Sequence, residues 1–65
     1  MSEEADLYYR MAVYQIHAGQ YREALVNLEI GLTLDYDGHE QLFDYFPDLE
    51  KQKALYRIIE QYREK

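Results

Sequence analysis

The sequence predicts an all-α protein in which three helices form one domain over residues 1–65. Three observations support this prediction. Apolar residues recur at spacings of three and four along most of the chain, as in helices that bury one face. No stretch alternates apolar and polar residues over a useful length, so strands are not expected. The chain has only three glycines and one proline, which leaves few points where helices can break.

The first predicted helix covers residues 2–18. It begins at Ser2, whose hydroxyl can accept a hydrogen bond from a free amide, and acidic residues follow in the first turn, where they meet the positive end of the helix dipole. We expect its core-facing side to hold the apolar residues spaced by four, three and four, with a second row alongside: Leu7, Met11, Tyr14 and Ala18, flanked by Tyr8, Ala12 and Ile16.

The second predicted helix covers residues 21–34 and follows a turn at Gly19 and Gln20. Because this turn is short, the second helix is expected to pack antiparallel to the first. One side of it holds Tyr21, Leu25, Leu28 and Leu32, and the roughly opposite side holds Val26, Ile30 and Leu34. A helix that is apolar on two sides needs two neighbours.

The second half of the chain predicts a short helical segment at residues 38–46 and a C-terminal helix at residues 47–65. Asp37 and Glu40 have the spacing of a capping box at the start of the short segment. A break or kink is expected near Phe46 and Pro47, because proline lacks an amide donor and disfavours helical geometry at the residue before it.

Residues 5–38 resemble a tetratricopeptide repeat, the helix-turn-helix unit of 34 residues found in scaffolding proteins. The resemblance rests on residues at the motif's aromatic, Leu-Gly, turn and second-helix positions, and on its closing Leu-Asp: Tyr8, Met11, Ala12, Gly19, Tyr21, Ala24, Leu25, Leu28, Leu32, Leu34 and Asp35. It implies a three-helix arrangement in which a helical hairpin is capped by the C-terminal helix, and it implies protein binding. Where this family usually has polar residues on its outer face, the chain has Val26 and Ile30.

A weaker resemblance covers the whole chain. The turn formed by Gly19, Tyr21, Glu23 and Ala24 is similar to that of microtubule-interacting-and-transport domains, which are three-helix bundles. This resemblance implies binding of short amphipathic helices in grooves between the helices. Pro47 departs from it, since the third helix of that family is generally continuous there.

Charge and composition limit the classes of partner and the cellular compartment that we expect. The net charge of −6 disfavours attraction to nucleic acid and to anionic lipid, so neither a nucleic-acid partner nor a membrane partner is expected. No apolar run approaches the roughly 20 residues that cross a bilayer, and the acidic N-terminus does not resemble a secretory signal. The chain has no cysteine, which favours a reducing compartment, and we expect a cytoplasmic protein.

The charges are unevenly distributed along the chain. Residues 1–50 hold eleven acidic residues and two arginines, whereas residues 51–65 hold five basic residues and two glutamates. The basic segment is expected to fold back onto the acidic body or to contact an acidic partner.

An enzyme is not expected from the inventory of reactive side chains. Ser2 and Thr33 are the only hydroxyl residues besides tyrosine, and His17 and His39 are the only histidines. The carboxylates are spread along the chain rather than paired. No catalytic residue, cofactor site or metal site is predicted, and Asp37, His39 and Glu40 are interpreted as helix-capping residues.

The sequence therefore predicts a module for protein–protein interaction that acts as an adaptor or regulator and binds a partner protein or forms a homo-oligomer. Its candidate interface residues are Val26, Ile30 and Leu34, together with Tyr9 and Tyr36, which lie away from the main apolar stripes. Two interpretations of Val26, Ile30 and Leu34 stay open: the C-terminal helix covers them, or they form an interface. An alternative function is that of a small acidic inhibitor occupying a basic site on a target protein, of which a nucleic-acid-binding site is one example.

Overall fold

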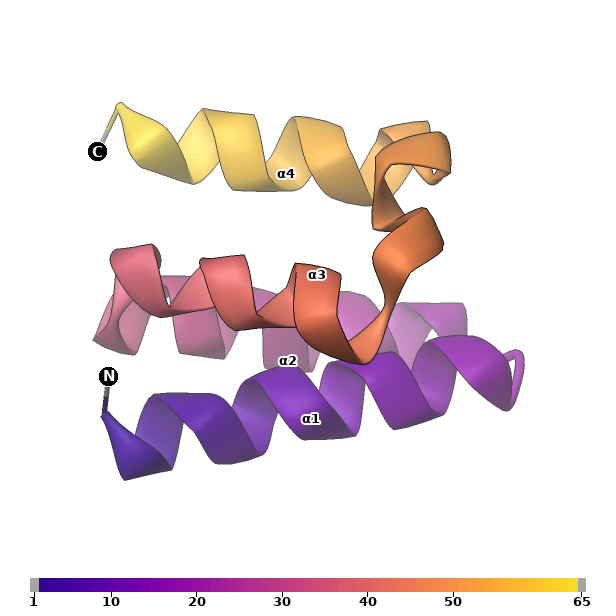
Figure 1. Cartoon of the computed structure of the whole chain (residues 1–65), viewed down its shortest axis with the longest axis horizontal. Coiled ribbons are helices and arrows are strands. Elements are labelled where there is room, and N and C mark those ends of the chain that lie inside the picture. The colour runs from indigo at the N-terminus through magenta and orange to yellow at the C-terminus, as the bar shows by residue number, and fades with distance from the viewer. Residues whose placement is uncertain (1, 65) are drawn as a thin grey trace.

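A computed structural model describes residues 2–64 of the chain. These residues are all-helical, without strands, so the predicted all-α class is confirmed, with four α-helices where three main helices were predicted. They form four α-helices and two short 3-10 helices in the order α1 (Glu3–His17), α2 (Tyr21–Leu34), η1 (Tyr36–Glu40), α3 (Gln41–Tyr45), η2 (Pro47–Lys51) and α4 (Lys53–Arg63). Figure 1 shows α1 and α2 side by side at one side of the molecule and α4 at the other.

The α1/α2 hairpin forms where the sequence predicts it. Ser2 caps α1, with its hydroxyl oxygen accepting from the Ala5 amide at 3.2 Å. Gly19 has a φ of +78°, the left-handed conformation that glycine adopts without steric cost, so the chain reverses here. Ala12 and Ala24 are both buried, and their small side chains allow the two helices to approach closely. The predicted second helix has the bounds observed for α2.

The face that α1 turns to the core differs from the predicted one. The main predicted row is exposed at Leu7, Met11, Tyr14 and Ala18, whereas Ala12 and Ile16 of the flanking row are buried as expected, together with Ala5, Tyr9 and Val13. The prediction of the main row was wrong because it placed the largest side chains of that row inside. Close packing against α2 instead favours a row with two alanines, which lets the helix axes approach.

Tyr9 fills the space that these small residues create. Its side chain is completely buried, and its hydroxyl donates to the Asp35 carbonyl oxygen at 2.6 Å. Gly31 on α2 faces the same ring, since a Cβ atom at Gly31 would lie 2.8 Å from Tyr9 Cε1. The Tyr9 ring of α1 therefore packs into the space that Gly31 leaves on α2 because it has no side chain.

The second half of the chain is more divided than predicted. The break at Phe46 is confirmed by its backbone angles of −145° and 81°. The predicted helix at residues 47–65 is, however, two helices, because Gln52 (φ −92°, ψ 80°) separates η2 from α4. The segment predicted at residues 38–46 starts earlier, as η1, and continues as α3. Lys65 lies outside the described residues.

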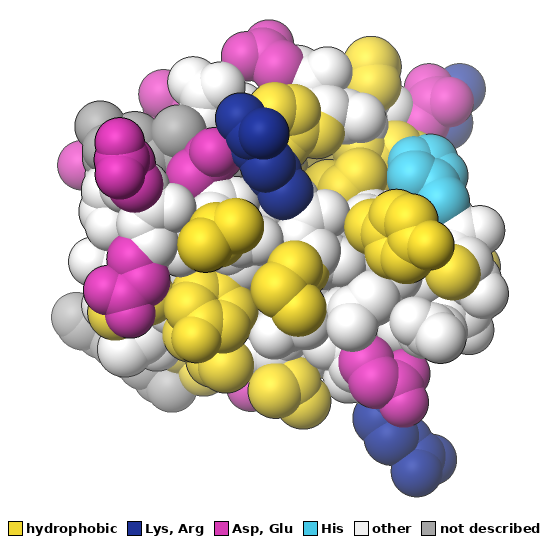
Figure 2. Space-filling view, turned by 90° about the horizontal axis from the view of Figure 1, so that it is seen from below, with side chains coloured by type: hydrophobic (Ala, Val, Ile, Leu, Met, Phe, Trp, Pro, Cys, Tyr) yellow, Lys and Arg dark blue, Asp and Glu magenta, His cyan; other side chains and the backbone are white. Residues whose placement is uncertain are grey.

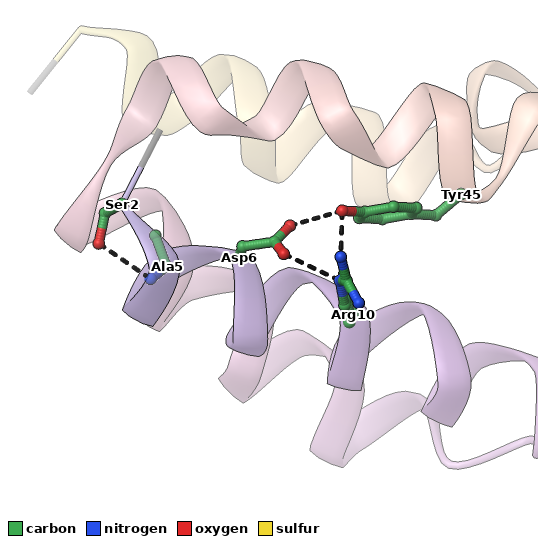
Figure 3. Close-up of polar contacts among 5 residues, drawn as sticks. All are labelled: Ser2, Ala5, Asp6, Arg10 and Tyr45. Atoms are coloured by element: carbon green, nitrogen blue, oxygen red, sulfur yellow. Dashed lines mark hydrogen bonds and ion pairs between the residues drawn. The ribbon is translucent and has the colours of Figure 1, made fainter.

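A polar network joins α1 to α3 (Figure 3). The Tyr45 hydroxyl donates to Asp6 Oδ1 at 2.6 Å, and Arg10 Nε lies 2.8 Å from Asp6 Oδ2 and 3.3 Å from the Tyr45 hydroxyl oxygen. The Arg10 guanidinium also stacks over the Tyr45 ring, 5.2 Å from its centre. The ion pair fits the i, i+4 spacing of Asp6 and Arg10, but sequence spacing alone does not reveal Tyr45 as their partner.

The outer elements of the bundle are α1 and α4. Within residues 2–64 these two helices do not contact each other, and α4 packs against α2, η1 and η2. One core cluster nevertheless includes residues from all four α-helices and from η2. No helix in the described part of the chain has the length and apolar character needed to span a membrane.

Candidate protein-interaction surfaces

Val26, Ile30 and Leu34 lie together in a groove between α2 and α4, which we call the α2/α4 groove. The exposed fractions of Val26 and Leu34 are 55% and 45%, and Ile30 is half-buried. The lining residues are Val26, Glu29, Ile30, Thr33, Leu34 and Tyr62. Thr33 donates its hydroxyl to the Glu29 carbonyl oxygen at 2.9 Å, so this polar group is satisfied within the helix. The groove therefore presents mainly carbon atoms to solvent.

The C-terminal helix covers only part of this apolar stripe. Tyr62 of α4 lines the groove, but about half of the Val26 and Leu34 surfaces stays open. Coverage by the C-terminal helix thus holds for part of the stripe, and an interface stays a prediction for the exposed part. The part that remains exposed is available to a partner.

Tyr9 was predicted as an interface residue, and the structure corrects this prediction. The side chain has no exposed surface and lies in the core between α1 and α2. Burial, together with the negative charge of nearby Asp35, raises the pKa of its hydroxyl above the ordinary value. Tyr9 looked separate from the apolar stripe because the wrong face of α1 had been assigned to the core.

Tyr36, the other tyrosine predicted at an interface, is the first residue of η1 and reaches α4. Its hydroxyl donates to the Ile59 carbonyl oxygen at 3.0 Å, and its ring lies against His39 with 4.6 Å between ring centres. Desolvation raises the pKa of this hydroxyl, with a further contribution from Glu60. Tyr36 is half-buried and holds α4 to the body, so it does not join the α2/α4 groove.

A second apolar surface lies on the outer side of α1, and the sequence reasoning missed it. This α1 surface is a shallow depression lined by Leu7, Arg10, Met11, Tyr14, Gln15 and Gln20. The exposed fractions of Leu7 and Tyr14 are 62% and 73%. Figure 2, seen from the side of α1, shows hydrophobic side chains over the middle of this face and acidic side chains around its edges. The signal for it was the presence of two apolar rows on this helix, of which the core takes only one.

The two histidines support local packing. His17 meets the Phe46 ring edge-on with 5.0 Å between centres. His39 directs Nδ1 toward the Tyr36 carbonyl oxygen at 2.5 Å and lies between the Tyr36 and Phe43 rings. Over residues 2–64, no three side chains of the His, Asp and Glu types are placed to hold a metal ion together.

Asp35 joins the ends of three helices, and it caps η1 where the sequence predicts Asp37 as the capping residue. Its carboxylate accepts from the Ser2 amide at 3.0 Å and from the Gly38 amide at 3.3 Å, while its own amide donates to the Gly31 carbonyl oxygen at 2.9 Å. It therefore caps η1 and ties the start of α1 to the end of α2. The hydrogen bond from Ser2 is the main reason that its pKa lies below the ordinary value.

This arrangement predicts a pH dependence of stability. Because the pKa of Asp35 is lowered in the folded state, its stabilising effect is present above the unfolded pKa, about 3.9, and is lost as pH falls through the folded pKa. Asp35→Asn keeps an acceptor but removes the charge. We expect the wild type to unfold at a higher urea concentration than the variant at neutral pH, with the difference shrinking in acid. A difference that stays constant with pH would contradict this role.

Comparisons with protein-family models, with curated protein sequences and with solved structures found no match to this chain. The two family resemblances therefore stay predictions, and function is argued from the surfaces themselves.

Proposed function

We propose that this chain is a non-enzymatic module that binds proteins, and that its ligand is an amphipathic helix of a partner or of a second copy, held in the α2/α4 groove. The observation that supports this most directly is the exposure of Val26 and Leu34 on a helix whose opposite face is in the core. Such an apolar stripe between two helices is suited to a third helix with anchors spaced by three and four residues.

The hairpin geometry supports the same proposal. An antiparallel helix pair with a glycine turn, followed by a helix that packs on its second member, is compatible with a tetratricopeptide-like unit capped by its C-terminal helix. In that reading, Val26 and Ile30 replace the polar outer face of the family with an apolar one. The apolar face that holds Val26 and Ile30 is then the binding surface that distinguishes this protein from the family.

The proposal is tested by placing a charge in the groove. We expect Val26→Glu combined with Ile30→Glu to leave the chain folded by circular dichroism, because Val26 is half exposed and Ile30 only half-buried. Peptides selected from a displayed library of amphipathic helices on the wild type should bind this variant at least about 100-fold more weakly, since a buried unpaired carboxylate is costly. If a second copy is the ligand, the variant should also show a smaller mass in sedimentation.

Met11→Glu is the matched control, because it places the same charge on an exposed apolar residue of the α1 surface. Peptides held in the α2/α4 groove should bind this control as they bind the wild type. The proposal fails if the selected peptides are insensitive to the groove variant, if they bind both variants equally weakly, or if the groove variant unfolds.

A further inference from the structure

The attachment of α4 to the body is apolar along its length. Leu55 and Ile59 are its buried side chains, and Ile58 and Tyr62 pack partly buried against the same core. The Tyr36 hydroxyl adds a hydrogen bond to the Ile59 carbonyl oxygen. Figure 1 shows α4 as the outermost helix, joined to the rest through η2. It covers the body along one stripe of its surface.

The basic charge of α4 is not used in specific ion pairs with the body. Arg63 pairs with Glu60 of the same helix, and Lys51, the last residue of η2 before α4, pairs with Asp48 of η2. Among the ion pairs of residues 2–64, none joins α4 to another element. The positive helix is thus attracted by the general field of the acidic body, which does not require a particular partner residue.

The helix is also poorly anchored at its start. Gln52 is its N-cap residue and makes no side-chain capping hydrogen bond, and the helix has only 11 residues. Helices of this length are not stable alone in water, so α4 that leaves the body unfolds. Segments with few buried side chains open locally at a lower free energy than the whole domain.

We propose that the body surface beneath α4 is a second docking site, that its ligand is a basic amphipathic helix of a partner protein, and that α4 occupies this site as an autoinhibitory segment. The seated α4 defines what fits: apolar residues spaced as Leu55, Ile59 and Tyr62, with positive charge on the outer face. Charge supports this ligand, because residues 1–50 hold eleven acidic residues against two arginines. This site lies under α4, not beside it, and does not depend on the α2/α4 groove.

Inhibition follows from competition between a tethered and a free helix. The tethered α4 has an effective concentration in the millimolar range, so a free helix of equal quality binds weakly. The apparent affinity of the free helix rises with the fraction of molecules in which α4 has opened. A change that weakens only the tethered helix should therefore strengthen binding in trans.

The test uses the full chain and a fluorescent peptide with the sequence of residues 51–65, followed by anisotropy. We expect the peptide to bind the Ile59→Ala chain at least about tenfold more tightly than the wild-type chain, because the chain loses a buried contact that the peptide keeps. Equal binding to both chains, or no binding to either, would overturn the proposal. Amide hydrogens of α4 should also exchange faster than those of α1 and α2.

A second variant covers the case in which Ile59→Ala does not fold. Arg57 is exposed, so Arg57→Glu in the chain should leave the fold intact, weaken the tethered helix and tighten peptide binding about threefold. Tyr14→Ala on the α1 surface, which α4 does not touch, should change nothing.

The ligand chemistry is tested with two altered peptides. A peptide with aspartate in place of Leu55 and Ile59 should not bind, and one with Lys53 and Arg57 changed to glutamate should bind more weakly than the unaltered peptide at low salt. Equal binding of the charge-reversed peptide would overturn the basic-helix assignment. Loss of peptide binding in the Val26→Glu chain would place the peptide in the α2/α4 groove and overturn the site beneath α4.

Discussion

Replacing Tyr9 by alanine is expected to leave the chain largely unfolded. The side chain is completely buried against α2, and removing a large aromatic side chain from a core costs about 3–5 kcal/mol. A single core of this size rarely supplies more than about 3–5 kcal/mol of net stability. The loss is therefore comparable to the whole free energy of unfolding. Far-UV circular dichroism and the spread of amide signals in NMR measure the outcome.

Two tyrosine variants separate packing from other effects. Tyr9→Phe keeps the ring and loses only the hydrogen bond to the Asp35 carbonyl oxygen, so it should fold and lose about 1 kcal/mol. Tyr21→Ala removes a tyrosine that is more than half exposed and should unfold near the wild-type urea concentration. If Tyr9→Ala proves as stable as Tyr21→Ala, Tyr9 does not have the central packing role described above.

The hairpin was predictable because its signals are local. Gly19 marks the turn through its own backbone freedom, Ser2 caps the helix that follows it, and the apolar spacing of α2 lies within one helix. For the same reason Val26, Ile30 and Leu34 could be placed on one side of α2, since helix geometry alone brings them together. The break at Phe46 follows from proline at the next position.

The features that were missed depend on contacts between residues far apart in the sequence. The core face of α1 is decided by the fit of Tyr9 to Gly31, and two rows on that helix have almost the same spacing. Tyr36 donates a hydrogen bond to a backbone carbonyl oxygen of α4. Because every residue has such an acceptor, no sequence pattern predicts this contact. The separation of η2 from α4 occurs at Gln52, where the sequence has neither the glycine nor the proline that usually indicates a helix break.

The fit of Tyr9 to Gly31 predicts that Gly31→Ala is destabilising, against the usual preference for alanine in helices. The added Cβ would lie 2.8 Å from Tyr9 Cε1, and the buried ring, fixed by its hydroxyl hydrogen bond, has little room to move. Alanine stabilises a helix interior by about 1 kcal/mol relative to glycine, while overpacking a core costs about 1–3 kcal/mol. The cost exceeds the gain because the added Cβ lies so close to the ring, and we expect a net loss of up to about 2 kcal/mol, measured by urea denaturation.

A double-mutant cycle shows whether the ring causes this loss. In a Tyr9→Leu background the aromatic atoms nearest to the added Cβ are gone, so Gly31→Ala should become neutral or stabilising through its helix preference. Gly19→Ala is the comparison for backbone strain, because its Cβ would meet nothing within 4 Å but would sit at a φ of +78°. That cost, about 1 kcal/mol, should not change with residue 9. If the cost of Gly31→Ala is likewise independent of residue 9, the destabilisation does not come from the tyrosine ring.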